Sequence, residues 1–101
     1  MSGSIDFVVC GTCVADLLVR PVALETPVGG GRLFPVDPIE FTTGGIVCNT
    51  GVAMRRLGAT VVAAAVVGDD LWGREVTVAL DAAGVGTSAV ERRTDGATST
   101  T

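Results

Sequence analysis

Three short stretches of the sequence are chemically suited to holding hydroxyl groups. Asp16 lies in an apolar stretch after the Gly11 turn, and an ionised carboxylate accepts the hydrogen bonds that vicinal hydroxyls donate. Gly44 and Gly45 precede a predicted helix, where bare backbone and unpaired N–H groups let a ligand oxygen approach closely. Asn49 lies one turn into that helix and can both donate and accept. Each stretch also has a purely structural interpretation: a solvated loop aspartate, a flexible turn, and an amide that faces solvent.

A fourth candidate is the acidic pair Asp69 and Asp70, between Gly68 and Gly73. The pair follows a predicted strand and precedes a predicted helix, which places it at the same edge of the sheet as the other candidates. Because Asp is a preferred N-cap residue, we expect this pair to cap the helix rather than to catalyse a reaction.

The elements that position these residues follow a βαβα order. Apolar runs at residues 5–11 and 60–67 indicate buried parallel strands, and helical spacing predicts helices at about 47–57 and 71–83, each followed by glycine. Residues 88–92 and 97–101 indicate two more strands around a turn at residues 94–96. This order predicts an α/β fold with a doubly wound, Rossmann-like parallel sheet, whose carboxyl edge binds ligands.

Residues 14–43 interrupt that order with repeated chain breaks. Pro21, Pro27, Pro35 and the triple glycine at 29–31 separate strand-like stretches at residues 17–19 and 36–43. Such breaks are typical of short, twisted or edge strands. We therefore expect a small β-sheet lid or subdomain between the first strand and the first helix.

The bulk composition limits the chain to one domain and excludes several classes of protein. With 101 residues, 48% hydrophobic and 4% aromatic, the chain is expected to build its core from Val, Ala and Leu. A net charge of -4 without a basic cluster argues against nucleic-acid and anionic-membrane binding. The longest apolar run, residues 61–67, is too short to span a bilayer, and the first residues lack a signal-peptide pattern. We expect a cytoplasmic protein.

The cysteines and the missing nucleotide motifs narrow the function further. Cys10, Cys13 and Cys48 form an odd set in a chain without His, so they complete neither a disulfide framework nor a zinc site. The spacing of Cys10 and Cys13 leaves a redox motif open, although buried free cysteines more often act as small hydrophobes. The absent G-x-G-x-x-G and G-x-x-x-x-G-K-[ST] patterns argue against a nicotinamide or flavin domain and against a P-loop.

Taken in order, these features resemble the start of the PfkB (ribokinase-like) carbohydrate kinases. The matching segments are Gly11 with Asp16, Gly44-Gly45 with Asn49, Arg56-Leu57-Gly58, Val67-Gly68-Asp69-Asp70 with Gly73, and Leu80-Asp81-Ala82-Ala83-Gly84-Val85. Val47, Gly51 and Gly86 depart from the family's usual residues. The resemblance implies that residues 1–101 are the N-terminal part of one ribokinase-like kinase domain, with lid strands at approximately 14–43 and 90–101.

The resemblance also implies roles for the candidate residues. Asp16, the Gly44-Gly45 backbone and Asn49 would hold the sugar hydroxyls beneath a lid that excludes water and pairs two subunits into a homodimer. ATP and Mg²⁺ are implied for the full-length enzyme, with ATP bound by a C-terminal part. That part carries the family's second signature, D-T-x-G-A-G-D, with the catalytic base and the anion hole. This segment lacks that signature, so we expect it to contain no catalytic residue, to bind no cofactor and to have no kinase activity alone.

The leading hypothesis is therefore the sugar-binding part of an ATP-dependent kinase that acts on a sugar or nucleoside hydroxyl. A second is a non-catalytic sugar-binding or dimerisation module derived from such a kinase. A third, a Rossmann-type oxidoreductase fragment, is disfavoured by the missing fingerprint. The substrates left open include ribose, fructose, sugar phosphates and nucleosides. The lack of a basic residue between positions 36 and 51 disfavours a phosphorylated sugar.

Overall fold

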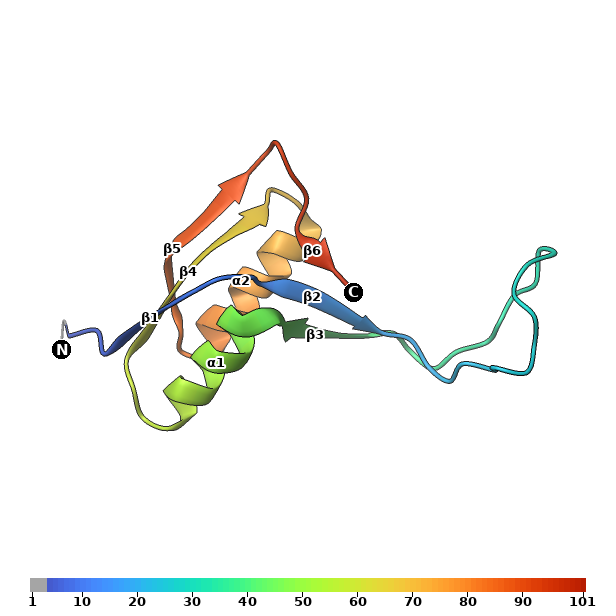
Figure 1. Cartoon of the computed structure of the whole chain (residues 1–101), viewed down its shortest axis with the longest axis horizontal. Coiled ribbons are helices and arrows are strands. Elements are labelled where there is room, and N and C mark those ends of the chain that lie inside the picture. Colours follow the sequence, from blue (N-terminus) through green and yellow to red (C-terminus); the bar gives the residue numbers. More distant parts are fainter. Residues whose placement is uncertain (1–3) are drawn as a thin grey trace.

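Six strands and two helices form the part of the chain described by the structure, residues 4–101 of a computed structural model (Figure 1). In chain order they are β1 (Phe7–Cys10), β2 (Val14–Leu18), β3 (Glu40–Gly44), α1 (Gly45–Arg56), β4 (Val61–Gly68), α2 (Leu71–Ala82), β5 (Gly86–Arg93) and β6 (Ser99–Thr100). Strands β1, β4 and β5 form a parallel sheet in the order β1-β4-β5, here called the core sheet. Strands β3, β2 and β6 form a second sheet. The predicted α/β class with a small additional sheet is confirmed.

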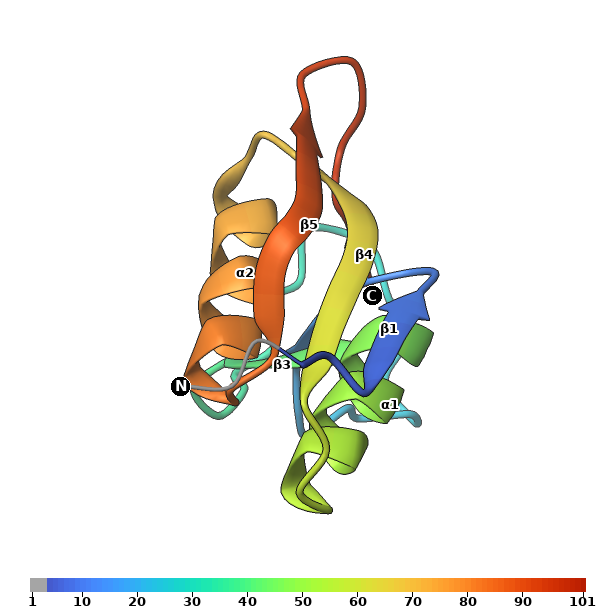
Figure 2. The same cartoon turned by 90° about the vertical axis from the view of Figure 1, so that its left-hand side faces the viewer.

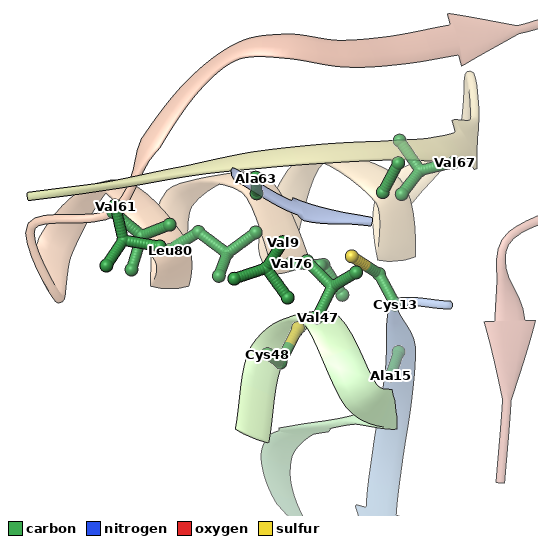
Figure 3. Close-up of a cluster of buried hydrophobic side chains, with 12 residues drawn as sticks. Val9, Cys13, Ala15, Val47, Cys48, Val61, Ala63, Val67, Val76 and Leu80 are labelled. Carbon is green, nitrogen blue, oxygen red and sulfur yellow. The ribbon is translucent and has the colours of Figure 1, made fainter. Parts of the chain in front are cut away.

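The central strand β4 explains where the core lies. Its residues Val61, Ala63, Ala65 and Val67 are buried on one face, whereas Val66 on the other face is exposed. Both helices pack against the buried face of the core sheet (Figure 2). In Figure 3 their buried side chains meet those of β4 in one cluster, with Val47 and Cys48 from α1 and Val76 and Leu80 from α2.

The helix ends follow the local chemistry expected of them. Helix α1 ends at Arg56, and Gly58 follows its C-cap Leu57 with a φ of +97°, a left-handed conformation that glycine adopts without a steric penalty. Arg55 and Arg56 in its last turn interact favourably with the negative end of the helix dipole. Helix α2 begins after Asp70, whose side chain accepts a hydrogen bond from the Gly73 N–H at 2.8 Å. The prediction that the acidic pair caps this helix is thus confirmed for Asp70.

The last two strands differ from the expectation. Residues 88–92 and 97–101 are predicted to be strands around a turn, and β5 and β6 lie there, but β5 pairs in parallel with β4 in the core sheet and β6 pairs in parallel with β2 in the second sheet. The reason is that residues 94–98 carry the chain from one sheet to the other instead of folding it back. Residues 90–93 consequently belong to the core, and the lid segment expected at 90–101 joins the second sheet only through β6.

Residues 19–39, here called the excursion, contain no strand or helix and extend away from both sheets (Figure 1). The second strand of this region begins only at Glu40, later than the expected residue 36. The base of the excursion is held by the Asp37 N–H, which donates to the Arg20 carbonyl at 2.8 Å, and by an Arg20–Glu40 ion pair at 2.9 Å. Neither of the helices in residues 4–101 is long and apolar enough to cross a membrane.

Candidate functional site

A hollow of about 550 Å³ lies where the open face of the core sheet meets the β1–β2 loop and β6 of the second sheet. Such a volume lies within the usual range for small-molecule sites. Its lining comes from the β1–β2 loop and from β4, β5 and β6, and consists of Gly11, Thr12, Cys13, Ala64, Ala65, Val66, Ala89, Glu91 and Ser99. None of the residues predicted to bind a sugar lines the hollow directly. They lie on the adjoining elements β2, β3 and α1.

Asp16 and Gly44 lie against each other. Asp16 is in β2, half-buried, and its register partner in β3 is Thr42, two residues before Gly44. A methyl group added to Gly44 would overlap the Asp16 carboxylate, with Cγ only 3.1 Å and Oδ1 3.2 Å away. Among residues 4–101 the Asp16 carboxylate has no hydrogen-bond or ion-pair partner. Its oxygens are therefore open to accept hydrogen bonds from a ligand.

Gly45 has a different neighbour, the β1–β2 loop. Its φ of +82° lies in the left-handed region, and a Cβ there would come within 2.5 Å of the Thr12 carbonyl oxygen. The same oxygen accepts a hydrogen bond from the Val47 N–H at 3.1 Å. Glycine at this position therefore lets the first turn of α1 dock onto the loop that lines the hollow.

Asn49 is exposed on α1, one turn after Gly45. No hydrogen bond or ion pair joins it to Asp16 or to the two glycines in the described part of the chain. The structure thus brings Asp16, Gly44 and the Gly45 turn together and leaves Asn49 at their margin. Thr12, Glu91 and Ser99 supply polar groups to the hollow that sequence reasoning missed. Only Thr12 has a local signal, its position directly after Gly11.

Cys13 and Cys48 are buried in the same core cluster and Cys13 also lines the hollow, whereas Cys10 is exposed. The Cys13 thiol is hydrogen-bonded to Cys48, and this bond together with burial raises the pKa of Cys13. The same bond lowers the pKa of Cys48, assisted by the Thr43 side chain and the Val14 backbone and opposed by burial and by the negative charge of Asp16.

Asp70 ties α2 to the segment that leads into β6. Besides the Gly73 N–H, its carboxylate accepts hydrogen bonds from the Thr98 hydroxyl at 2.6 Å and from the Thr98 N–H at 3.0 Å. The Thr98 hydroxyl oxygen in turn accepts from the Gly68 N–H at 2.9 Å. These bonds, from Thr98 first, hold the pKa of Asp70 below its ordinary value. Asp70 thus anchors the start of α2 to Thr98, the residue that precedes β6.

The comparison with known proteins points to one family. The model of the pfkB family carbohydrate kinases matches residues 5–101. The structure is similar to a fructokinase from Xylella fastidiosa, with 27% identity and a TM-score of 0.72, covering 90% of this chain and 26% of that one. It is also similar to a PfkB protein from Polaromonas sp. JS666, with 26% identity and a TM-score of 0.77, covering 96% and 30% of the two chains. No curated protein sequence matches the chain.

A third similar structure is a ribokinase from Cryptococcus neoformans var. grubii serotype A in complex with ADP, with 28% identity and a TM-score of 0.70, covering 92% of this chain and 28% of that one. A further structure of the Xylella fastidiosa fructokinase contains bound ATP. The chain spans less than a third of the length of each of these kinases. Since the family model matches nearly every residue and the fold agrees, the chain belongs to the pfkB family of carbohydrate kinases.

Proposed function

We propose that this chain is the sugar-binding part of an ATP-dependent kinase that phosphorylates a hydroxyl of a sugar or nucleoside. The observation that carries this proposal is the Asp16 carboxylate, which lies against Gly44 with no partner among residues 4–101, on the sheet that borders the hollow. A carboxylate with open acceptor positions fits neighbouring hydroxyl groups on a sugar ring. It would also repel a phosphate, which favours an unphosphorylated sugar.

In this proposal the other residues assist Asp16. The Gly44-Gly45 backbone leaves room for the ligand, and Asn49 supplies a donor and an acceptor from the first turns of α1. The second sheet and the excursion, together residues 14–43 and the β6 segment, act as a lid. Closure of such a lid excludes water, so that phosphate is transferred to the sugar and not to solvent.

The phosphoryl-transfer half of the reaction is assigned to the rest of the protein. Transfer needs a base on the attacking hydroxyl and positive charge around the phosphate, whereas the hollow's lining residues include Glu91 and no cation. ATP and Mg²⁺ would therefore be bound outside this segment. The open face of the core sheet supports a further layer, because Val8 and Val66 are each 57% exposed there and parallel sheets are normally covered on both faces.

We also propose that two copies associate through the excursion. Its apolar side chains are unusually exposed, above all Leu24 at 89%, Val28 at 92% and Leu33 at 94%. A patch of this kind marks an interaction surface, and a second copy offers the same apolar surface in return.

Three free cysteines in the described chain and the use of ATP favour a cytoplasmic location.

The excursion also supports the second candidate function, a non-catalytic sugar-binding or dimerisation module. The two candidates differ in whether the natural full-length protein phosphorylates the sugar that it binds. ATP-dependent phosphorylation of D-fructose or D-ribose, measured by coupled ADP release, would favour the kinase. Sugar binding without any ADP release above background would favour the module.

The binding site itself is tested by replacing Asp16 with Asn in the natural full-length protein. The amide keeps the shape but loses the charge, so at least one charged hydrogen bond of about 1.5 kcal/mol is weakened and the Kd should rise about tenfold or more. Calorimetric titration with D-fructose and D-ribose gives the Kd. The control is Glu75→Gln, which removes an equal charge from an exposed position on α2. Unchanged sugar affinity in a folded Asp16→Asn protein would falsify the assignment.

A further inference from the structure

The buried pair Cys13 and Cys48 takes no part in the proposed sugar kinase function. Both are core residues, with 4% and 1% of their surface exposed. They come from different elements, since Cys13 directly precedes β2 and Cys48 lies in the first turn of α1. Figure 3 shows both sulfur atoms projecting into the same buried cluster, and each thiol shifts the pKa of the other.

The backbone around the pair is held close enough for a covalent bridge. The Val47 N–H donates to the Thr12 carbonyl at 3.1 Å, so the residues preceding the two cysteines are in direct contact. On the following side, the Cys48 thiol interacts with the backbone of Val14. Disulfides form between residues whose Cα atoms are less than about 7 Å apart and whose side chains point toward each other. The contact between the residues that precede the two cysteines, together with their shared buried cluster, keeps the pair close, as such a bridge requires.

The two thiols are also unequal, which is what disulfide chemistry needs. The thiolate is the nucleophile, and the Cys48 thiolate is stabilised by hydrogen bonds from Cys13 and Thr43. The negative charge of Asp16 opposes this stabilisation. A small oxidant has a route to the pair, because Cys13 lines the hollow at the edge of the core sheet.

We propose that Cys13 and Cys48 form a reversible disulfide and are a redox modification site that controls the neighbouring ligand site. The oxidant is a peroxide. The Cys48 thiolate attacks one peroxide oxygen, the O–O bond breaks, and Cys48 becomes a sulfenic acid as the first water leaves. The Cys13 sulfur then attacks the Cys48 sulfur, the S–S bond forms, and the second water leaves. In total two thiols are oxidised, one peroxide is reduced to two waters, and a dithiol reductant reverses the step.

The bridge has a structural consequence because of what flanks it. Asp16 lies three residues after Cys13 in β2, Asn49 directly follows Cys48, and Gly44 and Gly45 join β3 to α1. An S–S bond is shorter than the contact between two thiols, so oxidation draws the first turn of α1 toward β2 and displaces these groups. Oxidation should therefore weaken sugar binding. This consequence rests on the proposed function, whereas formation of the bridge does not.

The bridge is tested on the natural full-length protein carrying Cys10→Ser, which removes the exposed neighbour and leaves the buried pair intact. The protein is treated with hydrogen peroxide, denatured, alkylated, and digested with trypsin, which cuts after Arg32 and Arg55 and so separates Cys13 from Cys48. Mass spectrometry should find the two peptides joined and lighter by two hydrogen atoms than their sum, and dithiothreitol should release them. Two fully alkylated free thiols after oxidation would overturn the proposal.

A matched variant and a binding assay separate the two parts of the inference. Cys48→Ser should lose the linked peptide while Cys10→Ser keeps it, which excludes a bridge between Cys10 and Cys48 as the source of that peptide. In the Cys10→Ser protein, the Kd for D-fructose or D-ribose should rise at least tenfold on oxidation and return on reduction. An oxidised protein with an intact bridge and unchanged Kd would overturn the control of sugar binding. A reduced protein that binds neither sugar would instead count against the proposed function.

Discussion

The contact between Gly44 and Asp16 gives the most specific prediction, which concerns Gly44→Ala. The φ of Gly44 is -137°, an extended conformation open to any residue, so alanine introduces no backbone strain. Its Cβ would overlap the Asp16 carboxylate, whose Cγ and Oδ1 lie 3.1 and 3.2 Å away. The carboxylate must rotate away from its present position. Gly44→Ala therefore displaces the carboxylate that is proposed to bind the sugar, and leaves the residue at position 16 an aspartate.

The expected loss of affinity follows from the bonds that the carboxylate would make. Two hydrogen bonds from vicinal hydroxyls to a charged acceptor are worth about 1.5 kcal/mol each at the lower end of the usual range. Their loss, about 3 kcal/mol, raises the Kd about 100-fold. Stability should fall by a smaller amount, about 1 kcal/mol, because alanine is also a poorer N-cap residue for α1 than glycine.

The assay is calorimetric titration of the natural full-length protein with D-fructose and D-ribose, with urea unfolding to confirm that the variant is folded. Gly96→Ala is the control, since no atom lies within 4 Å of a Cβ at that position. Combining Gly44→Ala with Asp16→Asn supplies a second check. Both changes act on one carboxylate, so the double variant should bind little worse than the weaker single variant. A folded Gly44→Ala protein with normal affinity, or strictly additive losses, would refute the reasoning.

Two further predictions concern association and acid stability. The variant Leu33→Asp places a charge in the excursion at a side chain that is 94% exposed, and should convert the dimer to a monomer when the molar mass is measured by light scattering. Leu57→Asp, at the exposed end of α1, is the control and should leave the dimer intact. A monomeric parent protein would contradict the proposed interface. The pKa of Asp70 is held below its ordinary 3.8 by Thr98, so the unfolded chain binds more protons and the stabilisation from Asp70 is fully present above that pH. This contribution should be lost as the pH falls below 3.8 through the folded-state pKa. The urea midpoint of the parent protein should therefore fall more between pH 6 and pH 3 than the urea midpoint of Asp70→Asn. An equal fall in the two proteins would contradict the assignment.

Local sequence patterns determined a large part of this fold. The apolar run at residues 60–67 predicts β4, and the spacing from Trp72 to Leu80 predicts α2, because these patterns depend on the period of one element alone. Gly58 and Asp70 marked a helix end and a helix start for equally local reasons, a left-handed φ and a side-chain cap. The order of these elements was sufficient for the α/β class and for the resemblance to the family.

Contacts between distant segments were decided only by the tertiary structure. The pairing of β5 with β4 and of β6 with β2, the bonds from Thr98 to Asp70, and the Cys13–Cys48 contact each join segments 20 or more residues apart. The periodic pattern of a helix or strand describes that element alone, so it does not indicate which distant residue will lie beside it. The same holds for the proposed sugar site. The sequence alone identified Asp16 and the two glycines as suited to hydroxyl groups, but only the register of β2 against β3 places that carboxylate against Gly44.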